Sequence, residues 1–155
     1  MRSAPSVACA VLRTALLLAA FAAVLAAPAA HGSDDVDVRK GGSLWARIEA
    51  DGAVRIDGSI AGEIEADGTV RVDGRIAGRV EEDGAIRDDG TLAGRVEKDG
   101  TLRRDGTIVG RIEEGGSIRR HGSIWGEASP CCPSFDDTRR LAALLYFFEP
   151  GFFRR

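Results

Sequence analysis

The chain has 155 residues, with 21 basic and 24 acidic side chains and a formal net charge of −3. This length is typical of one small domain. The mild acidity argues against general nucleic-acid binding, which uses a concentrated basic face. A hydrophobic content of 44% argues against a disordered chain. Twenty glycines in so short a chain are unusual, and their spacing carries most of the structural information.

The first thirty residues have the organisation of a secretory signal peptide. Arg2 and Arg13 precede an uncharged apolar run over residues 15–27, and small residues follow at 27–30. The run is short for a permanent membrane span, and an uncleaved N-terminal anchor is the alternative. We therefore predict that residues 1–30 are a signal peptide and that the mature protein reaches the periplasm or the extracellular space, which are oxidising compartments. No membrane contact is predicted beyond this segment.

A repeat of 16 residues follows. Glycines at positions 52, 58 and 62 recur with this period through five units, without exception. The apolar residues that keep the same period are Ile60, Ile64, Val70, Ile76, Val80, Ile86, Leu92, Val96, Leu102, Ile108, Ile112, Ile118 and Ile124. Val36 stands where a sixth unit would need its first glycine. The prediction is therefore five units over residues 41–128, preceded by a linker at 31–40.

The Asp-Gly pairs of the repeat are typical of β-hairpin turns, because glycine accepts the positive φ that such turns need. A two-residue turn would place Val96 and Leu102 on opposite faces, whereas a three-residue turn over 98–100 pairs them on one face. One face must be buried, so the three-residue turn with a glycine bulge is predicted. The same argument at residues 104–106 pairs Leu102 with Ile108 and places Ile108 inward.

Small and aromatic residues indicate how the hairpins are arranged. One inward position is glycine in successive units, which leaves space for backbones that crowd near an axis. These structural glycines are Gly62, Gly78, Gly94 and Gly110. Trp45 and Trp125 lie at equivalent positions at the two ends of the repeat, where they either seal the join between first and last strands or cap two exposed ends. A closed or nearly closed ring is predicted; a three-sided β-solenoid is the alternative, although 16 is not a multiple of the hexapeptide period.

The phrase Arg-Ile/Val-Glu-x-x-Gly-x-Ile/Leu-Arg, followed by Asp-Gly-x-Ile-x-Gly, recurs over residues 41–128. In this phrase the chain resembles the fivefold β-flower proteins of bacteria. The resemblance implies a mainly β fold built as a ring of β-hairpins, and a family with no assigned biochemical activity.

The composition changes after the repeat. Residues 129–133 are a predicted linker, and Ser134 with Asp137 forms a capping-box pattern at the start of a helix. Apolar residues then recur at i, i+3, i+4 and i+7, so one short α-helix is predicted over 134–149, followed by a tail at 150–155. Because this helix is apolar nearly all round, we expect it to cover the open face of the sheet or to join two copies of the chain. The tail either packs in the same way or touches a membrane surface.

A repeated row of carboxylates is the one pattern that suggests a metal, because calcium prefers oxygen ligands. The candidate ligands are Asp51, Asp67, Asp83 and Asp99. Asp before Gly is equally explained by the turn itself, so the first prediction is no metal and calcium is the alternative. His121 occupies a turn position that is Asp in four other units, and every carboxylate has equivalent copies, whereas active sites are normally unique. We therefore predict no enzymatic activity and no cofactor.

Cys131 and Cys132 are adjacent, and they can form a disulfide with each other, bridge two subunits or remain free thiols. Adjacent cysteines rarely satisfy ordinary disulfide geometry, which favours the last two states. Taken together, these patterns predict a non-catalytic, exported structural or interaction module of the bacterial envelope. Its partner is either another protein or a second copy bound through the C-terminal helix, and not nucleic acid. The alternatives are a calcium-dependent binding module and a polymerising β-solenoid scaffold.

Overall fold

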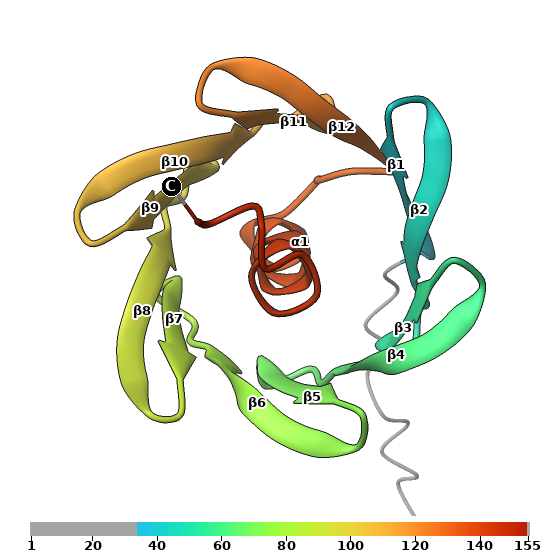
Figure 1. Ribbon diagram of the computed structural model, residues 1–155, viewed down its shortest axis with the longest axis horizontal. Coiled ribbons are helices and arrows are strands. Elements are labelled where there is room, and N and C mark those ends of the chain that lie inside the picture. The colour runs from blue at the N-terminus through green and yellow to red at the C-terminus, as the bar shows by residue number, and fades with distance from the viewer. Residues whose placement is uncertain (1–33, 155) are drawn as a thin grey trace, which may run out of the picture. The chain divides into compact units, whose positions relative to one another are not determined.

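The computed structural model describes residues 34–154, so the predicted signal peptide at 1–30 lies outside the described residues. These residues form twelve strands and one helix (Figure 1). In chain order the elements are β1 (Val36–Lys40), β2 (Ser43–Ile48), β3 (Ala53–Ile56), β4 (Ser59–Ile64), β5 (Thr69–Val72), β6 (Arg75–Val80), β7 (Ala85–Asp88), β8 (Thr91–Val96), β9 (Thr101–Arg104), β10 (Thr107–Ile112), β11 (Ser117–Arg120), β12 (Ser123–Ser129) and α1 (Phe135–Phe147). The prediction of a mainly β fold with one short C-terminal helix is confirmed.

The sheet closes on itself. Every strand pairs antiparallel with its neighbours in the chain, and β1 also pairs with β12 (Figure 1). Val38 of β1 lies opposite Ala128 on one side and Ala46 on the other, which fixes the register of the join. The predicted closed ring of hairpins is confirmed. The three-sided β-solenoid is wrong, because each strand has two paired antiparallel neighbours, and the structural basis of a polymerising solenoid scaffold is removed with it.

The ring contains six hairpins rather than the five predicted. β1 and β2 form the additional hairpin, so residues 36–40 are a strand and not part of a linker. Val38 lies 16 residues before Val54, in the same place in its hairpin. In the other units, the glycine equivalent to position 36 lies in the turn that leads from the preceding strand. β1 needs no such turn, because it meets β12 by pairing at the join.

The first of the two turns in each repeat has the predicted register. Val96 lies opposite Leu102, and the backbone N–H of Glu97 donates to the carbonyl of Thr101 at 2.8 Å. Gly100 takes the left-handed conformation with φ of 82°. The three-residue turn with a glycine bulge is therefore confirmed. The predicted inward pairing of Val96 with Leu102 is confirmed with it.

The second turn is shorter than predicted. Asp105 and Gly106 both have positive φ, of 50° and 75°, which makes a two-residue turn that matches the twist of the strands. Ile108 then lies opposite Arg103 instead of Leu102 and is 54% exposed, so its predicted inward position is wrong. A bulge between Ile108 and Gly110 adds one residue and returns the following side chains to the inward face.

Aliphatic side chains from all six hairpins line the interior. The helix α1 lies inside the ring (Figure 1). The first strands of the hairpins contribute Val38, Val54, Val70, Ile86, Leu102 and Ile118, and the second strands contribute Ile48, Ile64, Val80, Val96, Ile112 and Ala128. Residues 141–145 of α1 are buried against these rows. Burial of a valine, leucine or isoleucine contributes about 1.5–3 kcal/mol, so the helix completes a core that the ring alone leaves open.

The start and the end of α1 have separate causes. The predicted capping box is present: the Asp137 N–H donates to Ser134 Oγ at 3.2 Å, and the Ser134 N–H donates to the Asp137 carboxylate at 3.0 Å. The helix ends at Phe147, two residues earlier than predicted. The chain turns there, with the Phe152 N–H donating to the Glu149 carbonyl at 2.8 Å, and returns toward the ring. We refer to α1 and residues 148–154 together as the plug.

The inward glycines provide space for aromatic rings of the plug as well as for neighbouring backbone. A Cβ added to Gly62 would meet the Phe148 ring, one on Gly78 the Phe147 ring and one on Gly110 the Phe152 ring, each also colliding with a carbonyl of the next strand. A Cβ added to Gly94 would lie within ordinary contact distance of the Phe153 ring. Phe152 and Phe153 are fully buried, so the packing role predicted for the tail is confirmed and these two rings are not available to a membrane surface.

The two tryptophans lie beside the join, as one of the two interpretations of their positions predicts. Trp45 and Trp125 meet edge to face with ring centroids 5.4 Å apart, and Phe152 packs on Trp125 at 5.3 Å. The Lys40 ammonium lies 5.0 Å from the centroid of the Trp125 ring, a cation–π distance. The large indoles therefore fill the side of the ring where β1 meets β12.

Gly78→Ala should destabilise the fold by about 1–3 kcal/mol, because the added methyl collides with the Arg87 carbonyl and the Phe147 ring. Gly115→Ala is the matched control, since a Cβ at Gly115 would have no neighbour within 4 Å and its φ lies outside the left-handed region. We expect this control to change stability by less than about 0.5 kcal/mol. Urea denaturation of both variants measures the difference, and equal effects would contradict the close fit of plug to glycine.

Candidate functional site

One position of the repeat faces the C-terminal half of the plug, and its residue type changes around the ring. The six residues are Lys40, Ile56, Val72, Asp88, Arg104 and Arg120. Lys40 forms an ion pair of 3.1 Å with Glu149, and the Tyr146 hydroxyl donates to Asp88 at 3.2 Å. Burial, with a smaller contribution from the Asp88 charge, raises the pKa of Tyr146.

The arginines at this position bind the backbone of the tail. Arg120 donates from Nε to the Phe152 carbonyl at 2.8 Å and from Nη2 to the Arg154 carbonyl at 2.7 Å. Arg104 donates to the Phe153 carbonyl at 3.2 Å. Sequence reasoning missed these six positions, although the signal was present: they vary at a 16-residue interval, whereas the residue before each of them is always arginine. The polar groups of the interior are thereby engaged in holding the plug.

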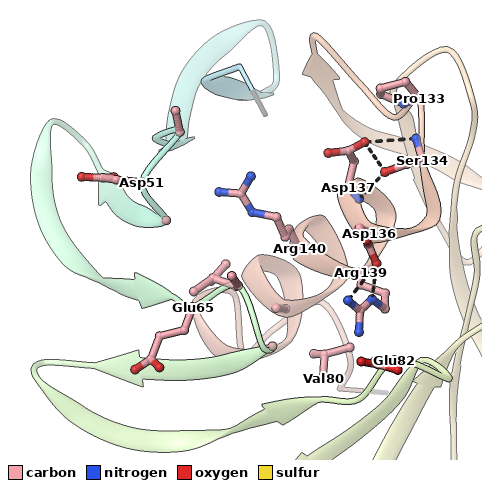
Figure 2. Close-up of a pocket in the computed structure, with 16 residues that line it drawn as sticks. Asp51, Glu65, Val80, Glu82, Pro133, Ser134, Asp136, Asp137, Arg139 and Arg140 are labelled. Atoms are coloured by element: carbon pink, nitrogen blue, oxygen red, sulfur yellow. Dashed lines mark hydrogen bonds and ion pairs between the residues drawn. The ribbon is translucent and has the colours of Figure 1, made fainter. Parts of the chain in front are cut away.

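A pocket of about 700 Å³ opens beside the first turns of α1, between the helix and the hairpin turns that carry Asp51, Glu65 and Glu82 (Figure 2). Arg139 and Arg140 point from the helix into this region. Arg140 extends toward the turn of Asp51, whereas Arg139 lies between the helix and Glu82 (Figure 2).

The two arginines of this pocket differ in their bonding. Arg139 binds Asp136 through Nε and Nη2, while its buried Nη1 has no hydrogen-bond partner among the described residues. Arg140 donates from Nη2 to the Glu49 carbonyl at 3.0 Å, and burial lowers its pKa. Arg139 is thus bound within its own helix, whereas Arg140 connects α1 to the turn after β2.

Most carboxylates of the pocket are already engaged. Asp137 caps the helix, Glu65 accepts from Arg71 at 2.6 Å, and Asp51 accepts the Ala53 N–H at 3.0 Å. Residues 34–154 contain no group of three or more His, Cys, Asp or Glu side chains placed to hold a metal ion. Ser134 and Asp137 do hydrogen-bond, but in the capping box rather than as a nucleophile with its base.

The predicted calcium ligands are distributed around the rim of the ring, one in each turn. Each accepts the backbone N–H two residues on, at 2.9–3.0 Å. Three of them also face an arginine in the second strand of the following hairpin, in the pairs Asp67–Arg79, Asp83–Arg95 and Asp99–Arg111. These backbone hydrogen bonds, with smaller contributions that include the arginines, lower the pKa of Asp67, Asp83 and Asp99. The structure therefore gives each aspartate a turn-forming contact and does not bring the four together.

His121 takes the left-handed position of the last two-residue turn, with φ of 47°. The equivalent positions of other hairpins are Asp57, Asp73, Asp89 and Asp105, which have φ of 46–50°. Asp tolerates this conformation better than most residues, because its short polar side chain bonds locally. The structure thus places the one described histidine at a hairpin tip, in a backbone role.

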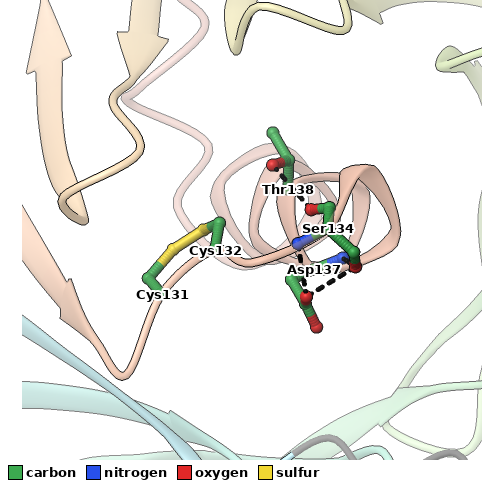
Figure 3. Close-up of a disulfide and its surroundings, with 5 residues drawn as sticks. All are labelled: Cys131, Cys132, Ser134, Asp137 and Thr138. Atoms are coloured by element: carbon green, nitrogen blue, oxygen red, sulfur yellow. Dashed lines mark hydrogen bonds between the residues drawn. A yellow bond between two sulfur atoms is a disulfide. The ribbon is translucent and has the colours of Figure 1, made fainter.

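Cys131 and Cys132 are joined to each other in a disulfide (Figure 3). A bond between these two residues is one of the three states that the sequence leaves open. The pair lies in residues 130–133, which we call the strap and which carry the chain from β12 to the cap of α1. Both side chains lie on one side of the strap where it turns toward the helix, which brings the sulfur atoms together (Figure 3).

The outward face of the ring carries one exposed aliphatic residue in each hairpin. These residues are Leu44, Ile60, Ile76, Leu92, Ile108 and Ile124, and they are 47–69% exposed. Each lies opposite an arginine of the paired strand, as Ile76 lies opposite Arg71. The six arginines are Arg39, Arg55, Arg71, Arg87, Arg103 and Arg119. We call these six aliphatic–arginine pairs the outer wall. Sequence reasoning missed the outer wall because the predicted length of the second turn was wrong.

Comparison of the chain with models of protein families, with curated proteins and with solved structures gives no match. What the fold itself defines is a closed, twelve-stranded antiparallel ring of repeated hairpins, which is β-flower-like in architecture. Within residues 34–154, no helix is long and apolar enough to cross a membrane.

Acid should destabilise the protein partly through the three aspartates with lowered pKa. A carboxyl group with a folded pKa below its unfolded value of about 3.9 stabilises the fold above that value, and the contribution is lost as pH falls through the folded pKa. The variant D67A/D83A/D99A should therefore have a lower thermal midpoint at pH 7 and a smaller further loss between about pH 5 and pH 2. The control D57N/D73N/D89N removes three carboxylates at the left-handed turn positions; an equal flattening in both variants would contradict the assignment.

The same aspartates separate turn chemistry from calcium binding. If they serve the turns, exchanging calcium for a chelator should leave the thermal midpoint of the wild-type protein unchanged. Circular dichroism measures this directly. A large rise with calcium, lost in D67A/D83A/D99A, would instead support a calcium-dependent module.

Proposed function

We propose that the chain is a non-catalytic, exported interaction module of the bacterial envelope, of the β-flower class, which binds a protein partner through its outer wall. The observation that carries this proposal is the sixfold display of an exposed aliphatic residue beside an arginine. Isolated aliphatic residues at a surface are ordinary. Their recurrence at one position of every hairpin, each with the same neighbour, is what favours a shared binding role.

The arginines of the outer wall are held in place, which favours recognition over random exposure. In five hairpins the arginine Nε donates to a glutamate of the preceding turn at 2.6–2.9 Å. Arg87 and Arg103 also donate to a carbonyl of their own hairpin tip, at Gly90 and Gly106. A guanidinium fixed at both ends loses little side-chain freedom when a partner binds beside it.

The absence of catalysis is supported by how the chemical groups of residues 34–154 are engaged. Carboxylates recur in turns or cap α1, and the described histidine forms a turn. The plug occupies much of the interior, and most carboxylates of the pocket that remains beside α1 are engaged. Export is supported by the sequence of residues 1–30 and is in keeping with a disulfide in the mature chain.

Self-association through the C-terminal helix is the less favoured partner hypothesis. The residues of α1 that would join two copies, 141–145, are buried in the chain's own ring. Such association would require α1 to leave that ring and expose its aliphatic lining. A partner on the outer wall requires no rearrangement.

Photo-crosslinking in the producing cells tests the outer wall. A photoreactive phenylalanine analogue at position 76 or 92 should capture the same partner, in the exported fraction, whereas the analogue at position 98 should not. Lys98 is the control because it is exposed in a turn on the rim and lies outside the outer wall. Failure of all six outer-wall positions to capture a protein, in a chain that is folded and exported, would overturn the proposal.

Replacing two apolar side chains by charged ones separates binding from folding at the same surface. Because Ile76 and Leu92 are more than half exposed, I76E/L92E should change the free energy of unfolding by less than about 0.5 kcal/mol. The variant should nevertheless lose the crosslinked partner when the analogue is placed at position 60. Retained crosslinking in a normally stable variant would contradict an apolar contact.

A further inference from the structure

The strap is the covalent connection between the ring and the plug in the described chain, and it contains both cysteines of residues 34–154. Cys131 and Cys132 are half-buried and bonded to each other, immediately before Pro133 and the Ser134 cap (Figure 3). Neither sulfur atom is joined to the ring wall or to α1, so the bond ties no second segment to the strap.

A bond between adjacent residues cannot act as a staple. The stabilisation that a disulfide gives through chain entropy grows with the number of residues in the loop that it closes. Cys131 and Cys132 enclose no intervening residue. The plug is positioned instead by the tail contacts of Arg104 and Arg120 and by apolar burial. The disulfide therefore calls for a chemical rather than a mechanical explanation.

The two sulfur atoms differ in access. Cys132 lines a pocket of about 180 Å³ together with Lys98, Phe135 and Thr138, which gives a small molecule a route to its side chain. Cys131 is covered from the other side by the turn before β11: a Cβ built on Gly116 would lie 3.4 Å from the Cys131 Cβ. An incoming nucleophile therefore reaches Cys132 first.

The charges around this pocket do not block a small neutral or cationic thiol. Glu113 is paired with Arg119 at 2.8 Å, and Asp99 accepts from the Thr101 backbone and faces Arg111. Lys98 adds one positive charge and Glu114 one negative charge. The charges at the entrance to this pocket therefore balance, and they do not repel a neutral or cationic thiol.

We propose that Cys131–Cys132 is a thiol–disulfide exchange site that takes two electrons from small-molecule thiols. A thiolate attacks Cys132 Sγ, the sulfur–sulfur bond breaks, and Cys131 leaves as a thiolate that takes up a proton. A second thiolate attacks the mixed disulfide at the sulfur of the bound thiol, which releases Cys132 in turn. In the balance, two thiols become one disulfide and the protein gains two cysteine thiols.

Cysteamine is a suitable probe, because it is a small cationic thiol. The full exported protein is treated with cysteamine without denaturant, quenched in acid and alkylated, and the peptide that contains residues 131 and 132 is weighed. We expect no alkylation before treatment, two alkyl groups after it, and one cystamine released per chain. The thermal midpoint of the treated protein should stay close to that of the untreated protein, because the plug is held by other contacts.

Three results would overturn the proposal: alkylation of both cysteines without any thiol, a disulfide-linked dimer on a non-reducing gel, or reduction that occurs only after the protein is unfolded. Each corresponds to a distinct state of the pair, namely free thiols, a bridge between subunits and an inert bond. All three can be read whatever the outer wall binds.

The single-cysteine variants test which of the two sulfur atoms a small molecule reaches more readily. In C131S the remaining Cys132 should form a mixed disulfide with cystamine at least about tenfold faster than Cys131 does in C132S. Far-ultraviolet circular dichroism controls for folding of both variants. Equal rates in two folded variants would overturn the assignment of Cys132 as the point of attack.

Discussion

The pairing of β1 with β12 is the contact on which the remaining structure depends, because it turns a meander of hairpins into a ring with an inside. An open meander of the same sequence would have two edge strands with unpaired backbone groups. Such edge strands can pair with strands of other chains and lead to aggregation. Closure also turns the inward aliphatic residues of all six hairpins toward one interior. In a closed barrel of eight strands, side chains just fill the interior. A ring of twelve strands is wider, so these side chains cannot meet across it. The plug is therefore a necessary consequence of closure and not an accessory to it.

The wall repeats and the plug does not, so the ring must depart from its own repeat wherever the two touch. The position shared by Lys40, Asp88 and Arg120 is the clearest case. Lys40 faces the Glu149 carboxylate, Asp88 accepts from the Tyr146 hydroxyl, and Arg120 donates to carbonyls of the tail. The position of Trp45 and Trp125 is another: the equivalent residue is small in the hairpins that receive aromatic rings of the plug, and large at the join. Six near-identical hairpins alone would give α1 several equivalent rotational settings. These exceptions favour one of them.

Much of the wall could be predicted from sequence, because its determinants are local. The 16-residue period, the pairing of Val96 with Leu102 and the cap at Ser134 each follow from the conformational preferences of a few neighbouring residues. The sixth hairpin could not be counted, because its missing turn glycine is compensated by pairing with β12, some ninety residues away in the chain. The predicted length of the second turn was wrong, because burial alone cannot distinguish a three-residue turn from a two-residue turn followed by a bulge. The calcium hypothesis and the plug contacts depended on which distant groups the closed ring brings together.

The length of that second turn also determines what the protein presents outward. Two left-handed residues at the tip, followed by a bulge, keep Gly110 inward while turning Ile108 out beside Arg103. The same local geometry recurs in each hairpin, so an identical aliphatic–arginine pair appears at intervals fixed by the ring. One such pair buries little surface and would bind weakly by itself. A rigid ring nevertheless presents several at once, and a partner that engages two or more gains from the high effective concentration of the second contact. In the proposed function, the plug would keep the spacing of the pairs constant while leaving the outward faces free.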